Sequence, residues 1–148
     1  CRSITLHQGL LHFVVNEDIV IYRVERGSVS ATGQVIHLPQ NYQGSNDIFF
    51  LGSRHGIFTS TPQKAFLFSS LDELAKGTAQ DVSAAFRGTP YSISRFDGRL
   101  WIPEITEYSA IRSYPAGGDS ISQASARTLF DFGEPDSQSM ERKRQIPT

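Results

Sequence analysis

The sequence predicts an all-β fold, and three observations lead to this prediction. Aromatic and β-branched residues are frequent, with ten Phe and five Tyr against a single Met, and such side chains suit half-buried strands better than helices. The apolar stretches are short and alternate with polar residues, which is the period of a strand. Gly, Pro, Asn, Asp or Ser interrupts these stretches every few residues, as expected for turns between strands.

The composition restricts the possible classes of protein. The 148 residues, 39% hydrophobic and 20% charged, are enough for one ordinary domain with a sizeable core. A formal net charge of −1 excludes a strongly basic module that binds nucleic acid through bulk electrostatics. A single cysteine, Cys1, excludes an internal disulfide framework and a multi-cysteine zinc site. No apolar run reaches half of the roughly 20 residues of a membrane helix, so no membrane span is expected.

The expected elements follow one another as three groups of strands. The expected strands are residues 10–15, 19–24 and 34–38, then 47–51, 56–60, 64–69 and 81–86, then 90–96, 98–102, 110–114 and 127–130. One short helix is expected at 70–77, in a loop of the second group, where Ser70 can begin the helix and Gly77 can end it. Residues 134–148 lack periodicity and aromatic side chains, so we expect an extended or mobile C-terminal tail.

The strand pattern repeats along the chain. Gly9, Gly56 and Gly98 each precede a strand that begins with aliphatic and aromatic residues, and they lie about 45 residues apart, a period typical of repeat architectures. The expected closing strands carry Val35, Val82 and Thr128 at a similar spacing. Four short strands per unit at this period are typical of β-propeller blades.

We therefore predict about three propeller-type antiparallel blade repeats, at residues 1–46, 47–89 and 90–133. A single β-sandwich is the alternative, because its turns also come about every 8–12 residues.

We predict no catalytic, cofactor-binding or metal-ligating residues. The four histidines are scattered over separate strands and loops: His7, His12, His37 and His55. His7 and His12 could meet if their strands paired, but zinc normally takes at least three protein ligands. The candidate nucleophiles lack an identifiable base; they are Cys1, Ser69 and Ser70.

Two pairs of carboxylates are explained without catalysis. Asp72 and Glu73 fall at the expected start of the helix, where negative charge is favourable. Glu104 and Glu107 are expected in an exposed hairpin loop, residues 103–109, as solvated charges. A paired-carboxylate hydrolase needs two acids at a fixed separation across a cleft, and the sequence does not indicate one.

Arginine dominates the basic residues, with only three lysines among fourteen. Five arginines lie within or beside expected strands: Arg23, Arg95, Arg99, Arg112 and Arg127. We expect them to face solvent; the alternative is an oligomer or partner interface held by pairs of arginine with an acid. The basic run at residues 141–144 is expected to belong to the solvated tail.

The first unit resembles a propeller blade in residues 9–15, 21–24 and 32–36. More narrowly, it resembles the opening blades of podovirus tail nozzle proteins, also called packaged-DNA stabilisation proteins. In that family a Gly-x-Leu-Tyr-x-Val strand precedes a Leu-Tyr-x-Val strand and a Gly-x-Ile return. Residues 98–102 and 66–72 also resemble blade phrases of that family, and the resemblance covers about residues 2–132.

The resemblance implies a non-enzymatic structural protein of the virion tail, in which a ring of subunits forms part of a channel for passing double-stranded DNA without specific binding. Nozzle proteins are several times longer and close a full ring within one chain, whereas about three units cannot close a propeller. We therefore expect either a longer chain or partners, which are a homo-oligomer or other assembly subunits.

Two other functions remain open. A secreted or surface-tethered propeller could bind sugars or other ligands through exposed aromatic residues such as Trp101 and Tyr108. A hydrolase on a propeller scaffold is a third possibility. The chain starts at Cys1 without a preceding Met, which is expected of a processed or partial chain, and a mature lipoprotein also begins with cysteine.

Overall fold

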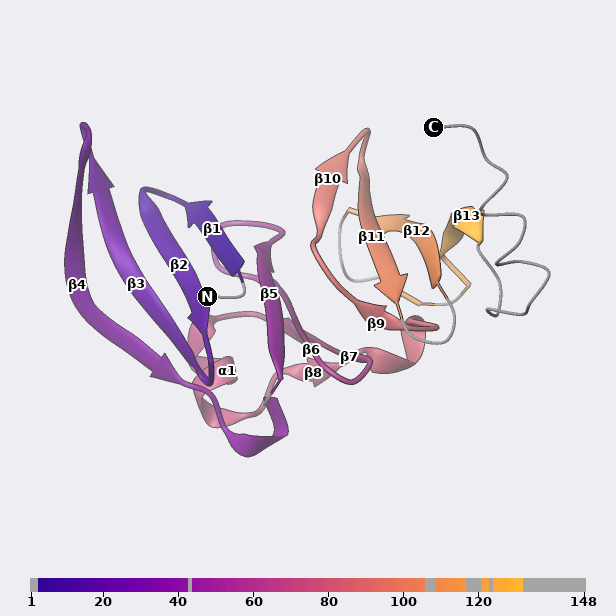
Figure 1. Ribbon diagram of the computed structural model, residues 1–148, viewed down its shortest axis with the longest axis horizontal. Coiled ribbons are helices and arrows are strands. Elements are labelled where there is room, and N and C mark those ends of the chain that lie inside the picture. The colour runs from indigo at the N-terminus through magenta and orange to yellow at the C-terminus, as the bar shows by residue number, and fades with distance from the viewer. Residues whose placement is uncertain (1–2, 43, 106–108, 117–120, 123, 132–148) are drawn as a thin grey trace, which may run out of the picture.

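The computed structural model describes residues 3–42, 44–105, 109–116, 121–122 and 124–131. The described residues form strands, one α-helix and two short 3-10 helices. The strands make three antiparallel sheets, and the strands of each follow their order in the chain, except that one short extra strand joins the third sheet. Figure 1 shows the sheets in succession, from indigo through magenta to orange. The all-β prediction is confirmed, with three sheets in place of the two of a sandwich.

The first sheet consists of β1 (Ser3–His7), β2 (Leu10–Val15), β3 (Asp18–Glu25) and β4 (Ser28–His37). The turn between β1 and β2 is formed by Gln8 and Gly9, whose φ angles are 51° and 73°. Two successive residues with positive φ are typical of a type I′ turn, whose twist matches that of a hairpin. Asp97 and Gly98 have φ angles of 51° and 68° at the equivalent turn of the third sheet.

The second sheet consists of β5 (Ser45–Phe50), β6 (Gly56–Ser60), β7 (Lys64–Phe68) and β8 (Gln80–Asp81). The helix α1 (Leu71–Lys76) lies between β7 and β8, as expected. Gly77 ends the helix in the left-handed conformation, but the Ser70 side chain makes no cap hydrogen bond. The Glu73 carboxylate instead accepts a hydrogen bond from the N–H of Ser69 across 2.9 Å.

The third sheet consists of β10 (Ser94–Phe96), β11 (Arg99–Ile105), β12 (Ser109–Pro115) and β13 (Arg127–Asp131), with the short β9 (Thr89–Pro90) paired to the end of β11. The 3-10 helix η1 (Gln40–Tyr42) connects the first sheet to the second. A second 3-10 helix, η2 (Ser83–Ala85), follows β8.

The predicted strand at 81–86 is wrong beyond its first residue. β8 ends at Asp81, whose carboxylate accepts a hydrogen bond from the N–H of Ser83 across 2.8 Å. A short side chain that bonds to the backbone two residues ahead favours a turn over a sheet ladder. The predicted strand at 90–96 is divided into β9 and β10.

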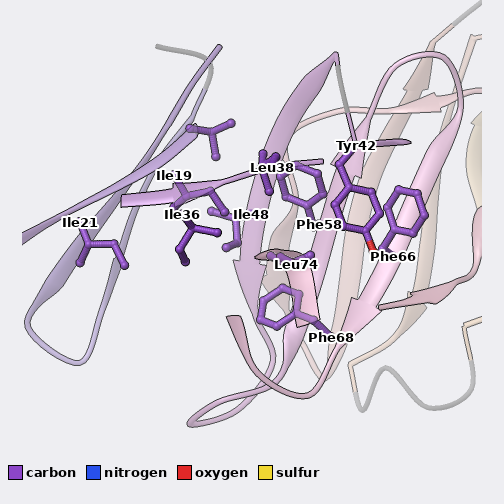
Figure 2. Close-up of a cluster of buried hydrophobic side chains, with 11 residues drawn as sticks. Ile19, Ile21, Ile36, Leu38, Tyr42, Ile48, Phe58, Phe66, Phe68 and Leu74 are labelled. Carbon is purple, nitrogen blue, oxygen red and sulfur yellow. The ribbon is translucent and has the colours of Figure 1, made fainter. Parts of the chain in front are cut away.

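The core lies in two layers between consecutive sheets. One cluster of buried side chains packs between the first and second sheets, and Figure 2 shows Ile19 and Ile36 from the first sheet on one side and Phe58 from the second on the other. The other cluster packs between the second and third sheets and includes Ile57 and Leu100. Since neighbouring residues of a strand point to opposite faces, the second sheet is enclosed on both of its faces.

Several expectations fall outside the described residues. They are the tail at 134–148, the basic run at 141–144, Cys1, Glu107 and Tyr108. In the part of the chain that the structure describes, no helix has the length and apolar character needed to cross a bilayer.

Candidate functional site

Equivalent positions of the three sheets point in the same direction, either toward the preceding sheet or toward the next one along the chain. Each sheet has one repeat glycine at the start of its second strand: Gly9, Gly56 or Gly98. The residue two positions after this glycine points toward the preceding sheet. Phe58 packs in the cluster shared with the first sheet, and Leu100 packs in the cluster shared with the second. The residue directly after the glycine points toward the next sheet along the chain. Leu10 packs against the first cluster, and Ile57 lies in the second. We call these two sides of a sheet its leading face and its trailing face.

The leading face of the first sheet is largely apolar on all four strands, with the pair of Asp18 and His37 at one end. The register places Ile4 opposite Phe13, which in turn lies opposite Val20, and Leu6 opposite Leu11. The apolar residues that share this face by register and alternation are Ile4, Leu6, Leu11, Phe13, Val15, Val20, Tyr22, Val24, Val29, Ala31 and Val35. Ile4 and Leu6 keep 61% and 63% of their surface exposed. A solvated face of an antiparallel sheet is normally polar, so this face has the composition of a packed one.

The trailing face of the third sheet also carries apolar side chains. It is formed by Phe96, Arg99, Trp101, Pro103, Ile105 and Ile111, which share one side by register. Phe96 is 72% exposed. The indole N–H of Trp101 donates to the carbonyl oxygen of Phe96 across 3.0 Å, which ties the ring to the β10–β11 hairpin. Arg99, at the start of β11, donates to the hydroxyl of Ser113 on the next strand across 2.8 Å.

β1, β5 and the segment that leads into β10 line a hollow of about 470 Å³. β1 and β5 are joined there by the hydroxyl of Thr5, which donates to the carbonyl oxygen of Ile48 across 2.8 Å. The carboxylate of Asp47 accepts hydrogen bonds from the hydroxyl of Ser3 and from the N–H of Ile93. One side chain of the second sheet therefore binds both the first sheet and the segment that leads into the third sheet.

The structure corrects the expectation for Glu104. β11 continues to Ile105, so Glu104 lies in a strand and is fully buried, not solvated in an exposed loop. Its carboxylate accepts hydrogen bonds from the N–H of Arg87 across 2.6 Å and from the hydroxyl of Tyr114 across 3.0 Å. Arg112 lies 3.4 Å from the same carboxylate and is itself buried. Burial, followed by the charge of Glu104, raises the pKa of the Tyr114 phenol.

The expectation that the arginines face solvent is therefore wrong for Arg112, which pairs with an acid inside its own chain. Arg23 and Arg127 are exposed, as expected. Arg95 is exposed too, but its guanidinium donates to the carbonyl oxygen of Leu51 across 2.9 Å and so binds the third sheet to the second.

His7 and His12 do come together. Their ring centroids lie 6.5 Å apart, and the ring of Phe50 stacks on His7 at 4.0 Å. His12 is buried, which lowers its pKa. No group of three or more potential metal ligands (His, Cys, Asp or Glu) occurs among the described residues. His37 pairs with Asp18 at 2.7 Å, away from the other histidines.

Two further hollows lie near these residues. His7, His12 and Phe50 line one of about 190 Å³. The other, of about 560 Å³, is lined by polar residues that include Arg54, His55, Glu73 and Gln80. Ser69 borders this second hollow and Ser70 the first. Asp72 makes an ion pair with Lys76 at 2.7 Å.

Searches against protein-family models, curated proteins and solved structures find no match for this chain. The resemblance to tail nozzle proteins therefore stays a prediction that rests on the sequence phrases.

Sequence reasoning missed the leading face, although the sequence contains a signal for it. Residues 10–15 and 19–24 read Leu-Leu-His-Phe-Val-Val and Ile-Val-Ile-Tyr-Arg-Val, apolar at nearly every position. Strands covered on one face alternate, whereas strands covered on both faces are almost continuously apolar. The missing alternation in residues 10–15 and 19–24 is typical of strands that are covered on both faces.

Proposed function

We propose that this chain is a non-enzymatic assembly protein, an arc of three propeller-type blades whose end faces are covered by further sheets in a ring. The blade units are residues 1–46, 47–89 and 90–133. The observation that carries the proposal is the apolar leading face of the first sheet. The second sheet shows the arrangement that we propose for the end sheets, because a neighbouring sheet packs on each of its faces.

Energetics favours a covered leading face. Complete burial of one Leu, Ile or Phe side chain contributes about 1.5–3 kcal/mol relative to exposure. Ile4, Leu6 and Val29 are all exposed on this face, so covering it gains several such contributions. A contiguous apolar patch on a protein surface is characteristic of an interaction site.

We propose further that the ring belongs to a virion tail and surrounds a channel, as in the nozzle proteins that the sequence resembles. A net charge of −1 suits a conduit through which DNA passes, because strong binding of phosphates needs many basic side chains.

The mass of the native assembly, with cross-links that locate its contacts, tests the assembly role. The expected result is a particle larger than one chain, with cross-links at the leading face of the first sheet. A monodisperse monomer at high protein concentration, with no other protein co-purifying, would overturn the proposal. The virion setting is tested separately by mass spectrometry of purified virions, and absence of the chain from them would refute it.

A ligand-binding module, secreted or attached to a cell surface, is the second candidate. The observation that favours it is the hollow of about 560 Å³, a size within the range of small-molecule sites, about 300–1,000 Å³. Binding on a glycan array that is lost in Arg54→Ala would support this function. An array without hits would remove it, and so would binding that persists in both Arg54→Ala and Trp101→Ala.

A further inference from the structure

We infer that the leading face of the first sheet is covered by the trailing face of the third sheet of a second copy of this chain. This inference rests on the proposed assembly role and names the partner. In Figure 1 the first and third sheets stand at the two ends of the row, with the second sheet between them.

The internal contacts determine which face must meet which. Between the first two sheets, the trailing residue Val14 packs in the same cluster as the leading residue Phe58. Between the second and third sheets, the trailing residue Ile57 packs in the same cluster as the leading residue Leu100. Both contacts join a trailing face to a leading face. A contact between copies that continues this pattern is head to tail and pairs two different surfaces.

The two end faces suit each other in chemistry and in size. The leading face presents mainly aliphatic side chains, and the trailing face presents Phe96, Trp101 and Ile105, which are aromatic or aliphatic. Arg99 also lies on the trailing face, and its guanidinium is hydrogen-bonded to the hydroxyl and carbonyl oxygens of Ser113. Each face spans four strands, a width of about 19 Å at the usual strand spacing. The new contact therefore has the same width as the two contacts within the chain.

Counting sheets gives the stoichiometry. Head-to-tail contacts either close into a ring or continue as a filament. Propellers close with about four to eight blades. The described residues form three sheets, so two copies supply six sheets and meet that condition. We therefore infer a closed dimer that contains two identical head-to-tail contacts.

Two exposed residues allow each face to be disabled separately. Leu6→Glu places a charge on the leading face, and Phe96→Glu places one on the trailing face. These side chains are largely exposed in the single chain, so both variants should keep the far-ultraviolet circular dichroism spectrum and melting temperature of the isolated monomer. Gln80→Glu adds the same charge at an exposed position of β8 and is the matched control.

The experiment measures the mass of the purified 148-residue chain in solution over a range of concentrations. The parent chain and Gln80→Glu should form dimers, and each single-face variant should raise the dissociation constant at least about 100-fold, since a buried charge is strongly unfavourable. The decisive sample is a mixture of Leu6→Glu with Phe96→Glu. One intact contact remains between these two variants, so the mixture should form a heterodimer that neither forms alone.

Three results would overturn the inference. A monomeric parent chain excludes the second copy as partner. A single-face variant that still dimerises indicates a contact between identical faces, and a mixture that remains monomeric excludes the head-to-tail arrangement. If the parent chain is monomeric but another protein cross-links to the leading face in the native assembly, the inference fails and the assembly role stands. If the native protein is a lone monomer, both fail.

Discussion

The carboxylate of Asp47 accepts a hydrogen bond from the backbone N–H of Ile93 across 3.0 Å. This contact joins the first strand of the second sheet to the segment that leads into the third. The same carboxylate accepts a hydrogen bond from the hydroxyl of Ser3 in the first sheet. It also explains why residues 90–96 do not form one strand, because the N–H of Ile93 bonds to a side chain instead of to a neighbouring strand.

Asp47→Ala should lower the free energy of unfolding by about 1–3 kcal/mol, the usual cost of leaving a buried hydrogen-bonding group without its partner. Asp47→Asn should lose less, because the amide keeps one acceptor oxygen. Urea denaturation of the three proteins is the measurement. Equal midpoints for the parent chain and Asp47→Ala would show that this contact does not support the arrangement of the sheets.

Tyr114→Phe removes a donor from the fully buried carboxylate of Glu104. We expect a loss of about 1–3 kcal/mol at neutral pH, because the carboxylate loses a hydrogen-bonding partner in a low-dielectric site. Tyr22→Phe, which removes a hydroxyl from the leading face, is the matched control. The measurement is again the free energy of unfolding, and equal losses in the two variants would contradict the proposed role of the buried hydroxyl.

The same tyrosine makes stability depend on alkaline pH. The pKa of Tyr114 is raised in the folded chain above its ordinary value of 10.0, so the unfolded state releases this proton first. The stabilisation is complete below pH 10 and declines as the pH rises above it. Denaturation curves between neutral and alkaline pH should show this decline in the parent chain and a smaller one in Tyr114→Phe. The same decline in both would refute the assignment.

His12 produces the opposite dependence on pH. Burial lowers its pKa below 6.5 in the folded chain, so the unfolded state binds this proton first as the pH falls. The stabilisation is complete above pH 6.5 and is lost as the pH falls through the lowered pKa. His12→Gln should reduce the loss of stability between neutral and mildly acidic pH. Identical pH profiles for the parent chain and His12→Gln would exclude His12 as the cause.

Gly56→Ala should destabilise the second sheet by more than Gly52→Ala. A Cβ atom at Gly56 would overlap the carbonyl oxygen of Phe49, which belongs to the paired strand β5 and cannot move aside. A Cβ atom at Gly52 would instead meet the side chain of His55, which is exposed and can rotate away. Thermal unfolding of both variants tests this difference. A melting temperature for Gly56→Ala equal to that of Gly52→Ala would contradict the overlap.

Sequence patterns predicted the elements whose causes are local. The strands at 10–15 and 56–60 match β2 and β6 at both ends, because turn residues and apolar alternation mark their limits. The repeat glycines each stand at the start of the second strand of a sheet, but for different physical reasons. Gly9 and Gly98 supply positive φ in tight turns, whereas Gly56 leaves room for a neighbouring strand.

Most of the features that were missed depend on distant residues. β1 is the exception: it pairs with β2 across a two-residue turn, but its five-residue alternation is too brief to mark a strand. Glu104 resembles a loop charge in sequence, and its burial is made possible by Arg112 and Tyr114 on the next strand. The hydrogen bond from Ile93 to Asp47 spans 46 residues, so no local pattern indicates it.

The enclosure of the second sheet has a consequence for cooperativity. In an array of stacked repeats, each unit adds its own stability and that of its contacts with its neighbours. The second sheet has two such contacts and each end sheet has one within the chain, so local opening should begin at the ends and reach β6 last. A closed ring would remove this difference in local stability between the end sheets and the second sheet. Every sheet would then have two neighbours, and no end sheet would be left to open first.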